Sequence, residues 1–261
     1  MDTSMDQRRA VLAALQKLTR VLFDSRPMSM GEAWELCLPS CPVVLSSPFG
    51  LRQTTLDAIL IGSESLSTAL SQYARDKEPE VWLDENIAAA WCDYQQAGSL
   101  VAFAWVSGRW KVSGLASTSN EKHHLPPEPS DRILPQVVKP INALLSAFAT
   151  PDWATLKSHF LPGAECTLYR YPAPPMRMTT ENSIVRLQGL GASRPGGSTI
   201  RERIFDVDCR KRADIAFVWA PFKVEFGGVD RHEGVNIFTL LKKDEEWVLC
   251  GCQDFAKDIA Q

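Results

Sequence analysis

The sequence lacks a long apolar run. Its longest uninterrupted apolar stretches are Ile87–Cys92, Leu100–Val106 and Ile215–Phe222. A helix that crosses a bilayer needs about 18–20 such residues, so none of these stretches is a candidate. The first residues, Met1–Arg9, include two acidic residues and lead into an amphipathic segment, which is not the pattern of a signal peptide. We therefore expect a cytoplasmic protein with no membrane partner.

An excess of basic charge is also missing. Lys and Arg total 28 against 31 Asp and Glu, which gives a formal net charge of −3. A protein that binds nucleic acid through its overall charge needs a basic surface to neutralise several phosphates. This composition excludes that class, and no nucleic-acid partner is expected.

The familiar cofactor and metal motifs do not occur. The chain has no dinucleotide-binding or P-loop glycine pattern, no H-E-x-x-H and no Gly-x-Ser-x-Gly. The seven cysteines are odd in number and stand mostly in apolar runs, which favours buried, reduced thiols over a disulfide framework. Cys250-Gly-Cys252 and His123-His124 are weak metal candidates, better interpreted as strand residues and a solvated loop. No cofactor and no metal are expected.

What the sequence does contain is an internal duplication. The i, i+1, i+4, i+7 spacing of one apolar helical face occurs first in Val11, Leu12, Leu15, Leu18, Val21 and Leu22, and again in Val137, Val138, Ile141, Leu144, Leu145 and Phe148. A short helix with N-terminal capping signals follows each time, at Ser29–Glu32 and at Thr150–Asp152. The second long helix is predicted to begin near Lys139, because Pro140 is tolerated in a first helical turn.

A third helix and several strands complete each half. The third helix is predicted to carry Leu66–Tyr73 in the first half, and to start at Thr179 or Thr180 in the second. Strand-like runs follow, and their landmark residues match in pairs: Trp91 with Trp219, Trp110 with Trp247, and Gly114 with Gly251. The second half is predicted to have the longer central hairpin, around Phe226–Gly234. The domains are thus residues 1–118 and 137–261, joined by a Pro-rich linker over 119–136.

Helices followed by a long antiparallel sheet, with Trp and Gly in the last strand, resemble the nuclear-transport-factor-2-like (NTF2-like) superfamily. The resemblance is carried by Asp214–Phe222, His232–Trp247 and Val248–Asp254. It implies the cone-shaped α+β fold of ketosteroid isomerase, scytalone dehydratase and SnoaL-like cyclases, here in two tandem copies. Because the apolar convex face of such a sheet needs a cover, we expect the two sheets to pack together as an intramolecular pseudo-dimer. Further homodimerisation stays open.

The best candidate for proton transfer is His232, which shares a strand face with Asn236 and Phe238. The resemblance implies that the position of Asn236 lines the pocket. Imidazole is a natural acid/base near neutral pH, and a carboxamide can hold a carbonyl or enolate oxygen. The alternative for His232 is a rim residue bonded to the backbone. Matching the halves on their tryptophans places Gln95 opposite His232 and Ser99 opposite Asn236, so the first half is expected to be a degenerate partner.

Weaker pocket candidates come from the other strands. Tyr169 and Tyr171 share a face and could donate to a substrate oxygen, although a core position is their alternative. Asp254 follows the last strand where the resemblance implies an acidic residue. An inward-facing Asp206 carboxylate is costly unless it takes part in the chemistry or is paired with another group. The predicted apolar wall consists of Trp219, Phe222 and Phe238, and Trp219 could equally pack between sheets.

The sequence leads to two main functional hypotheses, beside that of a regulatory partner of another enzyme, which an exposed apolar patch would support. The first is a cofactor-independent enzyme that cyclises, isomerises or dehydrates a hydrophobic carbonyl-containing metabolite, as in polyketide or terpenoid biosynthesis. The second is a non-catalytic protein of the same fold that binds a small molecule or serves as a scaffold. Several polar groups that converge in a pocket favour the enzyme, and a cone filled by its own side chains favours the scaffold. The basic segments Arg201–Arg203 and Arg210–Arg212 are interpreted as solvated surface.

Overall fold

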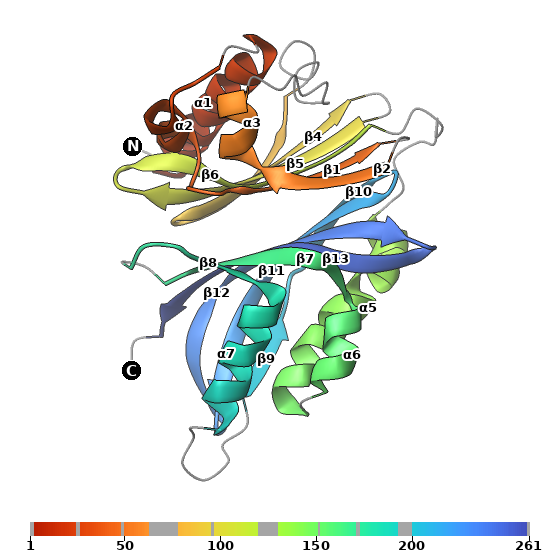
Figure 1. The fold of residues 1–261 in the computed structure, drawn as a ribbon. Helices are drawn as coiled ribbons and strands as arrows, with labels where there is room; N and C mark the ends of the chain where they lie inside the picture. The colour runs from red at the N-terminus through yellow and green to blue at the C-terminus, as the bar shows by residue number, and fades with distance from the viewer. Residues whose placement is uncertain are drawn as a thin grey trace. The chain divides into compact units, whose positions relative to one another are not determined.

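The structure, a computed structural model, contains two compact units. It describes residues 3–24, 27–47, 50–62, 78–94, 97–119, 130–150, 152–170, 173–192 and 200–259. One unit comprises Met1–Pro127 with Lys211–Ile215, and the other comprises Glu128–Arg210 with Ala216–Gln261. Each unit has its own sheet and its own helices (Figure 1). The predicted fold class of two tandem α+β domains is therefore confirmed.

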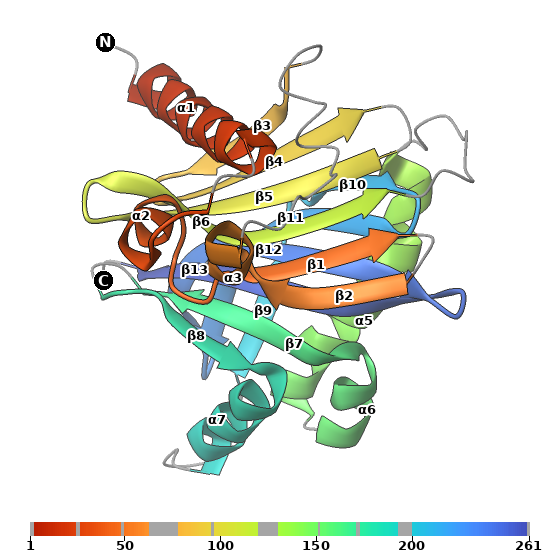
Figure 2. The ribbon, with the colours of Figure 1, turned by 45° about the horizontal axis from the view of Figure 1, so that its top comes forward.

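The first unit is a six-stranded sheet covered by helices on one face, as Figures 1 and 2 show. Its elements in chain order are α1 (Thr3–Asp24), α2 (Met30–Leu36), β1 (Pro42–Ser47), β2 (Gly50–Thr55), α3 (Leu56–Gly62), β3 (Glu80–Asp84), β4 (Ile87–Tyr94), β5 (Ala97–Val106) and β6 (Arg109–Ser119). The strands are ordered β2-β1-β6-β5-β4-β3, and β1 runs parallel to β6.

The second unit repeats this plan. Its elements are α5 (Ser130–Ala149), α6 (Trp153–Ser158), β7 (Phe160–Tyr169), β8 (Met176–Thr179), α7 (Thr180–Ala192), β9 (Ile200–Ile204), β10 (Asp208–Arg212), β11 (Ile215–Phe226), β12 (Val229–Lys243) and β13 (Glu246–Asp258). The strand order is β8-β7-β13-β12-β11-β10, with β9 also paired to β11, and β7 runs parallel to β13. In both units the strand after the second helix thus pairs in parallel with the last strand.

Both sheets contain a β-bulge at an equivalent position. The pairing of β5 with β6 shifts register between Ala102 and Phe103, and the pairing of β12 with β13 shifts between Thr239 and Leu240. These two bulges lie 137 positions apart, the same offset that separates Trp110 from Trp247. A bulge bends its strand and strengthens the local twist, so its repetition gives both sheets a bend at the same place.

Local sequence explains most of the helices. The apolar stripe of α1 is buried, with Val11 and Leu18 fully inaccessible. At α2, the Ser29 hydroxyl accepts from the Glu32 amide at 3.3 Å, and the Glu32 carboxylate accepts from the Ser29 amide at 2.8 Å, which forms the predicted capping box. The third helix predicted over Leu66–Tyr73 lies outside the described residues.

Three boundaries differ from the prediction. Helix α5 begins at Ser130 and contains both Pro135 and Pro140, because the burial of its apolar face outweighs the lost backbone hydrogen bonds. Asp152, and not Thr150, caps α6 by accepting from the Thr155 amide at 3.1 Å. The strand predicted to contain Asp206 is interrupted, and this interruption separates β9 from β10.

The longer hairpin of the second half is present. Strand β12 has 15 residues against 10 in β5, and Gly227 and Gly228 form its turn with φ values of 59° and 86°. All seven cysteines are free and buried, as their apolar surroundings predict. In the part of the chain that the structure describes, no helix is both long and apolar enough to span a membrane.

Gly234 is required by the close approach of β12 and β13. A Cβ atom at Gly234 would lie 1.8 Å from the backbone oxygen of Phe255, whereas one at Gly189, on α7, meets nothing within 4 Å. We predict that Gly234→Ala lowers the free energy of unfolding by about 1–3 kcal/mol through backbone displacement. Gly189→Ala should raise it by about 0.5–1 kcal/mol through helix propensity.

Urea unfolding of both variants beside the wild type measures this difference. Equal stability of the two alanine variants would contradict the register that places Gly234 against Phe255.

Candidate functional site

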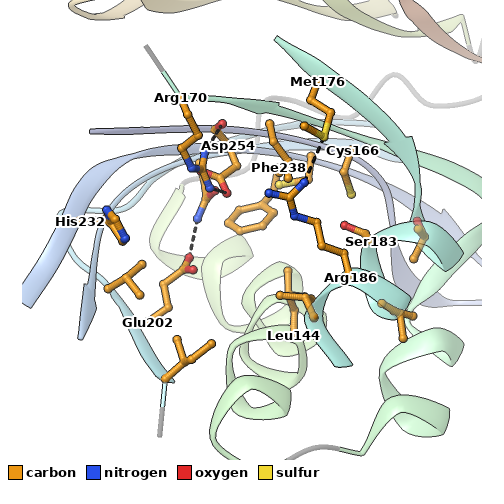
Figure 3. Close-up of a pocket in the computed structure, with 18 of the residues that line it drawn as sticks. Leu144, Cys166, Arg170, Met176, Ser183, Arg186, Glu202, His232, Phe238 and Asp254 are labelled. Carbon is orange, nitrogen blue, oxygen red and sulfur yellow. Dashed lines mark hydrogen bonds and ion pairs between the residues drawn. The ribbon is translucent and has the colours of Figure 1, made fainter. Parts of the chain in front are cut away.

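The second unit encloses a cavity of about 480 Å³. Its walls come from α5, α6 and α7 and from the sheet face that these helices cover, as the close-up in Figure 3 shows. Most of the lining is apolar, including Leu144, Phe160, Ile184, Leu187, Val224 and Phe238. A volume of this size suits a small organic ligand, and the lining favours a hydrophobic one.

Four polar side chains gather on the sheet side of this cavity: Arg170, Glu202, Asn236 and Asp254. Asn236 and Asp254 are direct partners across β12 and β13. The Nδ2 atom of Asn236 donates to Oε1 of Glu202 at 2.7 Å, which links β12 to β9. Asn236 is only 4% exposed, so this hydrogen bond fixes the orientation of the Glu202 carboxyl group.

Arg170 and Asp254 form a bidentate ion pair. The guanidinium donates to Oδ1 at 3.0 Å and to Oδ2 at 2.7 Å, and also to the backbone oxygens of Asp254 and Tyr169. Burial tends to lower the pKa of Arg170, but the Asp254 charge and hydrogen bonds raise it overall. The pair therefore places a fixed carboxylate beside Glu202.

Glu202 has the most altered proton affinity of these groups. Burial raises its pKa, and the Asp254 charge raises it further, while the Asn236 hydrogen bond and the Arg170 charge oppose the shift. The resulting pKa is about 8, so Glu202 is mostly protonated at neutral pH. Because Oε1 accepts from Asn236, the proton belongs on Oε2, where it can be donated to a ligand.

His232 lies at the side of this cluster and lines the same cavity. Its Nδ1 atom is 2.8 Å from Oδ1 of Asp258, its partner across β12 and β13, and its ring packs edge-on against Phe226. The His232 side chain is 36% exposed and the Asp258 side chain 89%. The imidazole thus contacts both the cavity and solvent, which is the geometry of a residue at the rim.

The structure brings together four of the nine predicted site residues: His232, Asn236, Phe238 and Asp254 line the cavity. Tyr171 lies outside the described residues. The other four, Tyr169, Asp206, Trp219 and Phe222, are not among the lining residues.

Strand alternation explains these exceptions. Leu168 and Arg170 face the cavity, so Tyr169 between them points to the other face, where its ring packs edge-on against Phe255. Trp219 likewise differs in parity from the lining residues Val224 and Phe226 of the same strand. Phe222 shares their parity but is buried beside Ile204, its cross-strand partner.

Asp206 was assigned to a strand, and this was wrong. It lies in the turn between β9 and β10 with a φ of 45° and an exposed side chain.

Sequence reasoning missed Glu202, which it counted with a solvated segment. Arg201 and Arg203 are indeed exposed, but Glu202 alternates with them and lies on the same face as Ile200 and Ile204. A carboxylate between two isoleucines on one strand face was the available signal. Arg170 carried no comparable signal, because its partner Asp254 is distant in sequence.

Among its described residues, the first unit has serines at three positions of the polar cluster. The constant offset of 137 places Ser99 at the position of Asn236 and Ser117 at that of Asp254. These serines are also cross-strand partners, and their hydroxyls are 2.7 Å apart. The parallel pairings place Ser47 where the second unit has Arg170. Gln95, the predicted counterpart of His232, lies outside the described residues.

No metal site is formed by the described part of the chain, where no three His, Cys, Asp or Glu side chains are grouped to hold an ion. The carboxyl groups at the cavity are engaged with Arg170 and Asn236 instead.

No protein-family model matches this chain, and no curated protein does. Among solved structures it is similar to an NTF2-like protein of unknown function from Shewanella baltica, with 11% identity over 51% of this chain and 99% of that one, at a TM-score of 0.38. It is also similar to a protein of the NTF2-like family from Streptomyces avermitilis, provisionally described as a dehydratase, with 17% identity over 50% and 99% of the chains, at a TM-score of 0.40. Each match spans about half of this chain.

The raised pKa of Glu202 makes stability depend on pH. Between its ordinary value of 4.5 and about 8, the folded state keeps a proton that the unfolded state has lost. Stability therefore falls as pH rises through this window, by up to about 1.4 kcal/mol per pH unit. Gln does not titrate, so the stability of Glu202→Gln relative to the wild type should increase as pH rises from 4.5 to about 8. Above that pH the difference between the two should stay constant.

Urea unfolding at several pH values from 4.5 to 9 tests this prediction. Glu246→Gln, at an exposed position of the same unit, is the matched control and should follow the wild type. If the profiles of Glu202→Gln and the wild type run parallel, Glu202 titrates like a solvated carboxyl group.

Proposed function

We propose that the second unit is a cofactor-independent enzyme that moves protons on a hydrophobic, carbonyl-containing small molecule. The observation that carries this proposal is the pair of carboxyl groups in one apolar cavity: Glu202 holds its proton at neutral pH, and Asp254 is a carboxylate paired with Arg170. Two carboxyl groups whose surroundings assign them opposite protonation states are suited to act as acid and base.

The chemistry follows from these assignments. The Glu202 proton on Oε2 is donated to the carbonyl oxygen of the ligand, which acidifies the adjacent C–H group. The Asp254 carboxylate accepts that proton, and the ligand becomes an enol. Transfer of that proton from Asp254 to another carbon, with return of the enol proton to Glu202, isomerises the ligand. Where the ligand carries a β-hydroxyl group, transfer of the Asp254 proton to this group, with return of the enol proton to Glu202, releases water and restores the carbonyl group. Attack by the enol on a second carbonyl group closes a ring.

The cluster replaces His232 as the principal acid. His232 is bonded to Asp258 near solvent, whereas Glu202 is held by Asn236 at the cavity. We retain His232 as a rim residue that can exchange protons with water. The hydrophobic lining supports a substrate of the polyketide or terpenoid type.

The alternative of a scaffold predicts a cone filled by its own side chains. The cavity of about 480 Å³ and its converging polar groups favour an enzyme over that alternative. The first unit, with serines at three positions of the cluster, fits a structural partner.

A generic probe tests proton transfer without knowledge of the natural substrate. 2-Tetralone is a bicyclic ketone with acidic C–H groups, and its hydrogen–deuterium exchange in D₂O is followed by NMR. We predict that the wild type accelerates this exchange and that Glu202→Gln reduces the enzymatic rate by about 10²–10⁴-fold. Glu246→Gln should retain the full rate.

The pH profile assigns the role of Glu202. Because the acid form is the active one, the enzymatic rate should fall as pH rises through about 8. Binding of 2-tetralone without acceleration by the wild type would make this protein a binder, and full activity of Glu202→Gln would remove that residue from the mechanism.

A further inference from the structure

The cavity carries a second polar feature away from the acid cluster. Arg186 and Ser183 lie three positions apart on α7 and both line the cavity, so they share one helix face with Leu187. Figure 3 shows the Arg186 side chain reaching from α7 toward the cavity, on the opposite side from Glu202 and His232.

The Arg186 guanidinium has no carboxylate partner in the described residues. Its one hydrogen bond there is donated by Nη1 to the Sδ atom of Met176 at 3.1 Å, and a thioether is a weak acceptor. The other cationic group of the lining, Arg170, is occupied by Asp254. Arg186 is also exposed, so its remaining planar donors are hydrated and are accessible to a bound group.

The other ionisable groups that line the cavity are paired or neutral. Arg170 and Asp254 cancel each other, Glu202 is mostly protonated, and His232 faces the carboxylate of Asp258. Arg186 is left as the uncompensated charge of the cavity lining, which is thus complementary to a single anionic group. Apolar side chains, including Leu144 and Phe238, lie between the two polar ends.

We propose that Arg186 is an anion subsite and that the substrate is a hydrophobic molecule with a carboxylate at the end opposite its reactive carbonyl group. This inference rests on the proposed function, because it extends the same cavity. The guanidinium binds the carboxylate in the forked geometry that the two planar groups share. The Arg170–Asp254 pair and Glu202 then receive the carbonyl end, so the charge orients the substrate.

Two matched probes separate the carboxylate from the rest of the ligand. 9-Oxodecanoate carries a ketone and a carboxylate joined by a flexible chain, and decan-2-one carries the ketone and chain alone. We predict that the wild type binds 9-oxodecanoate about tenfold more tightly than decan-2-one in isothermal titration, and that added salt reduces this advantage.

The variants assign this difference to one residue. Arg186→Met should abolish the tenfold preference and leave decan-2-one binding unchanged, while Arg186→Lys should retain part of it. Arg203→Met is the control, since Arg203 lies on the exposed face of β9 and pairs with Asp230. It removes the same charge from the same unit and should keep the preference.

The outcomes distinguish this subsite from the proposed chemistry. Equal binding of the two probes by the wild type, no binding of 9-oxodecanoate, or an unchanged preference in Arg186→Met overturns the anion subsite. A preserved preference together with no acceleration of 2-tetralone exchange overturns the catalytic proposal and leaves the subsite standing. Glu202→Gln should retain the preference, because its carboxyl group is at the other end of the cavity.

Discussion

The partial burial of one carboxyl group sets the electrostatics of the candidate site. Glu202 stands on a strand face with two isoleucines and lines an apolar cavity, so its ionised form loses hydration. A neighbouring carboxylate, Asp254, adds repulsion and is itself held by Arg170. Asn236 then orients the remaining neutral group. The protonation of each carboxyl group depends on the other groups of the cluster. Without Arg170, the negative charges of Glu202 and Asp254 would repel each other with no cation to compensate them.

The duplicated fold gives this arrangement its setting. Both units place a bulge at the same point of equivalent strands and pair their first strand in parallel with their last. The same frame holds two hydrogen-bonded serines, Ser99 and Ser117, in one unit and Asn236 with Asp254 in the other. The same strand arrangement therefore accommodates either pair of residues. The polar residues of the site can change without a change of fold, as expected where one fold serves several functions.

The two ends of the cavity also differ in their polar groups. The acid cluster occupies the sheet side, Arg186 approaches from α7, and apolar side chains separate them (Figure 3). A ligand with a polar group at each end can satisfy both sites only in one orientation. Orientation of this kind lowers the entropic cost of bringing the reacting atoms together, which is a large part of what a cofactor-independent enzyme can contribute.

Periodicity in the sequence, together with the family resemblance, predicted the fold class and the duplication. The repeated apolar stripes, the capping box at Ser29 and the paired tryptophans predicted two tandem α+β units, and alternation along β12 placed Asn236, Phe238 and His232 on one face. Such patterns are local, so they can be read along the chain. They failed where a boundary was misjudged, as at Asp206, and they left open whether Tyr169 faces the cavity or the core.

The sequence by itself determined the elements, their duplication and the residue types available for proton transfer. Only the tertiary structure decided that Glu202 meets Asn236, 34 positions away, and that Arg170 meets Asp254, 84 positions away. Those encounters depend on strand order, because β7 pairs with β13, and β9 and β12 both pair with β11. The proton affinity of Glu202 depends in turn on burial and on a charge from another strand, and neither is written in its local sequence.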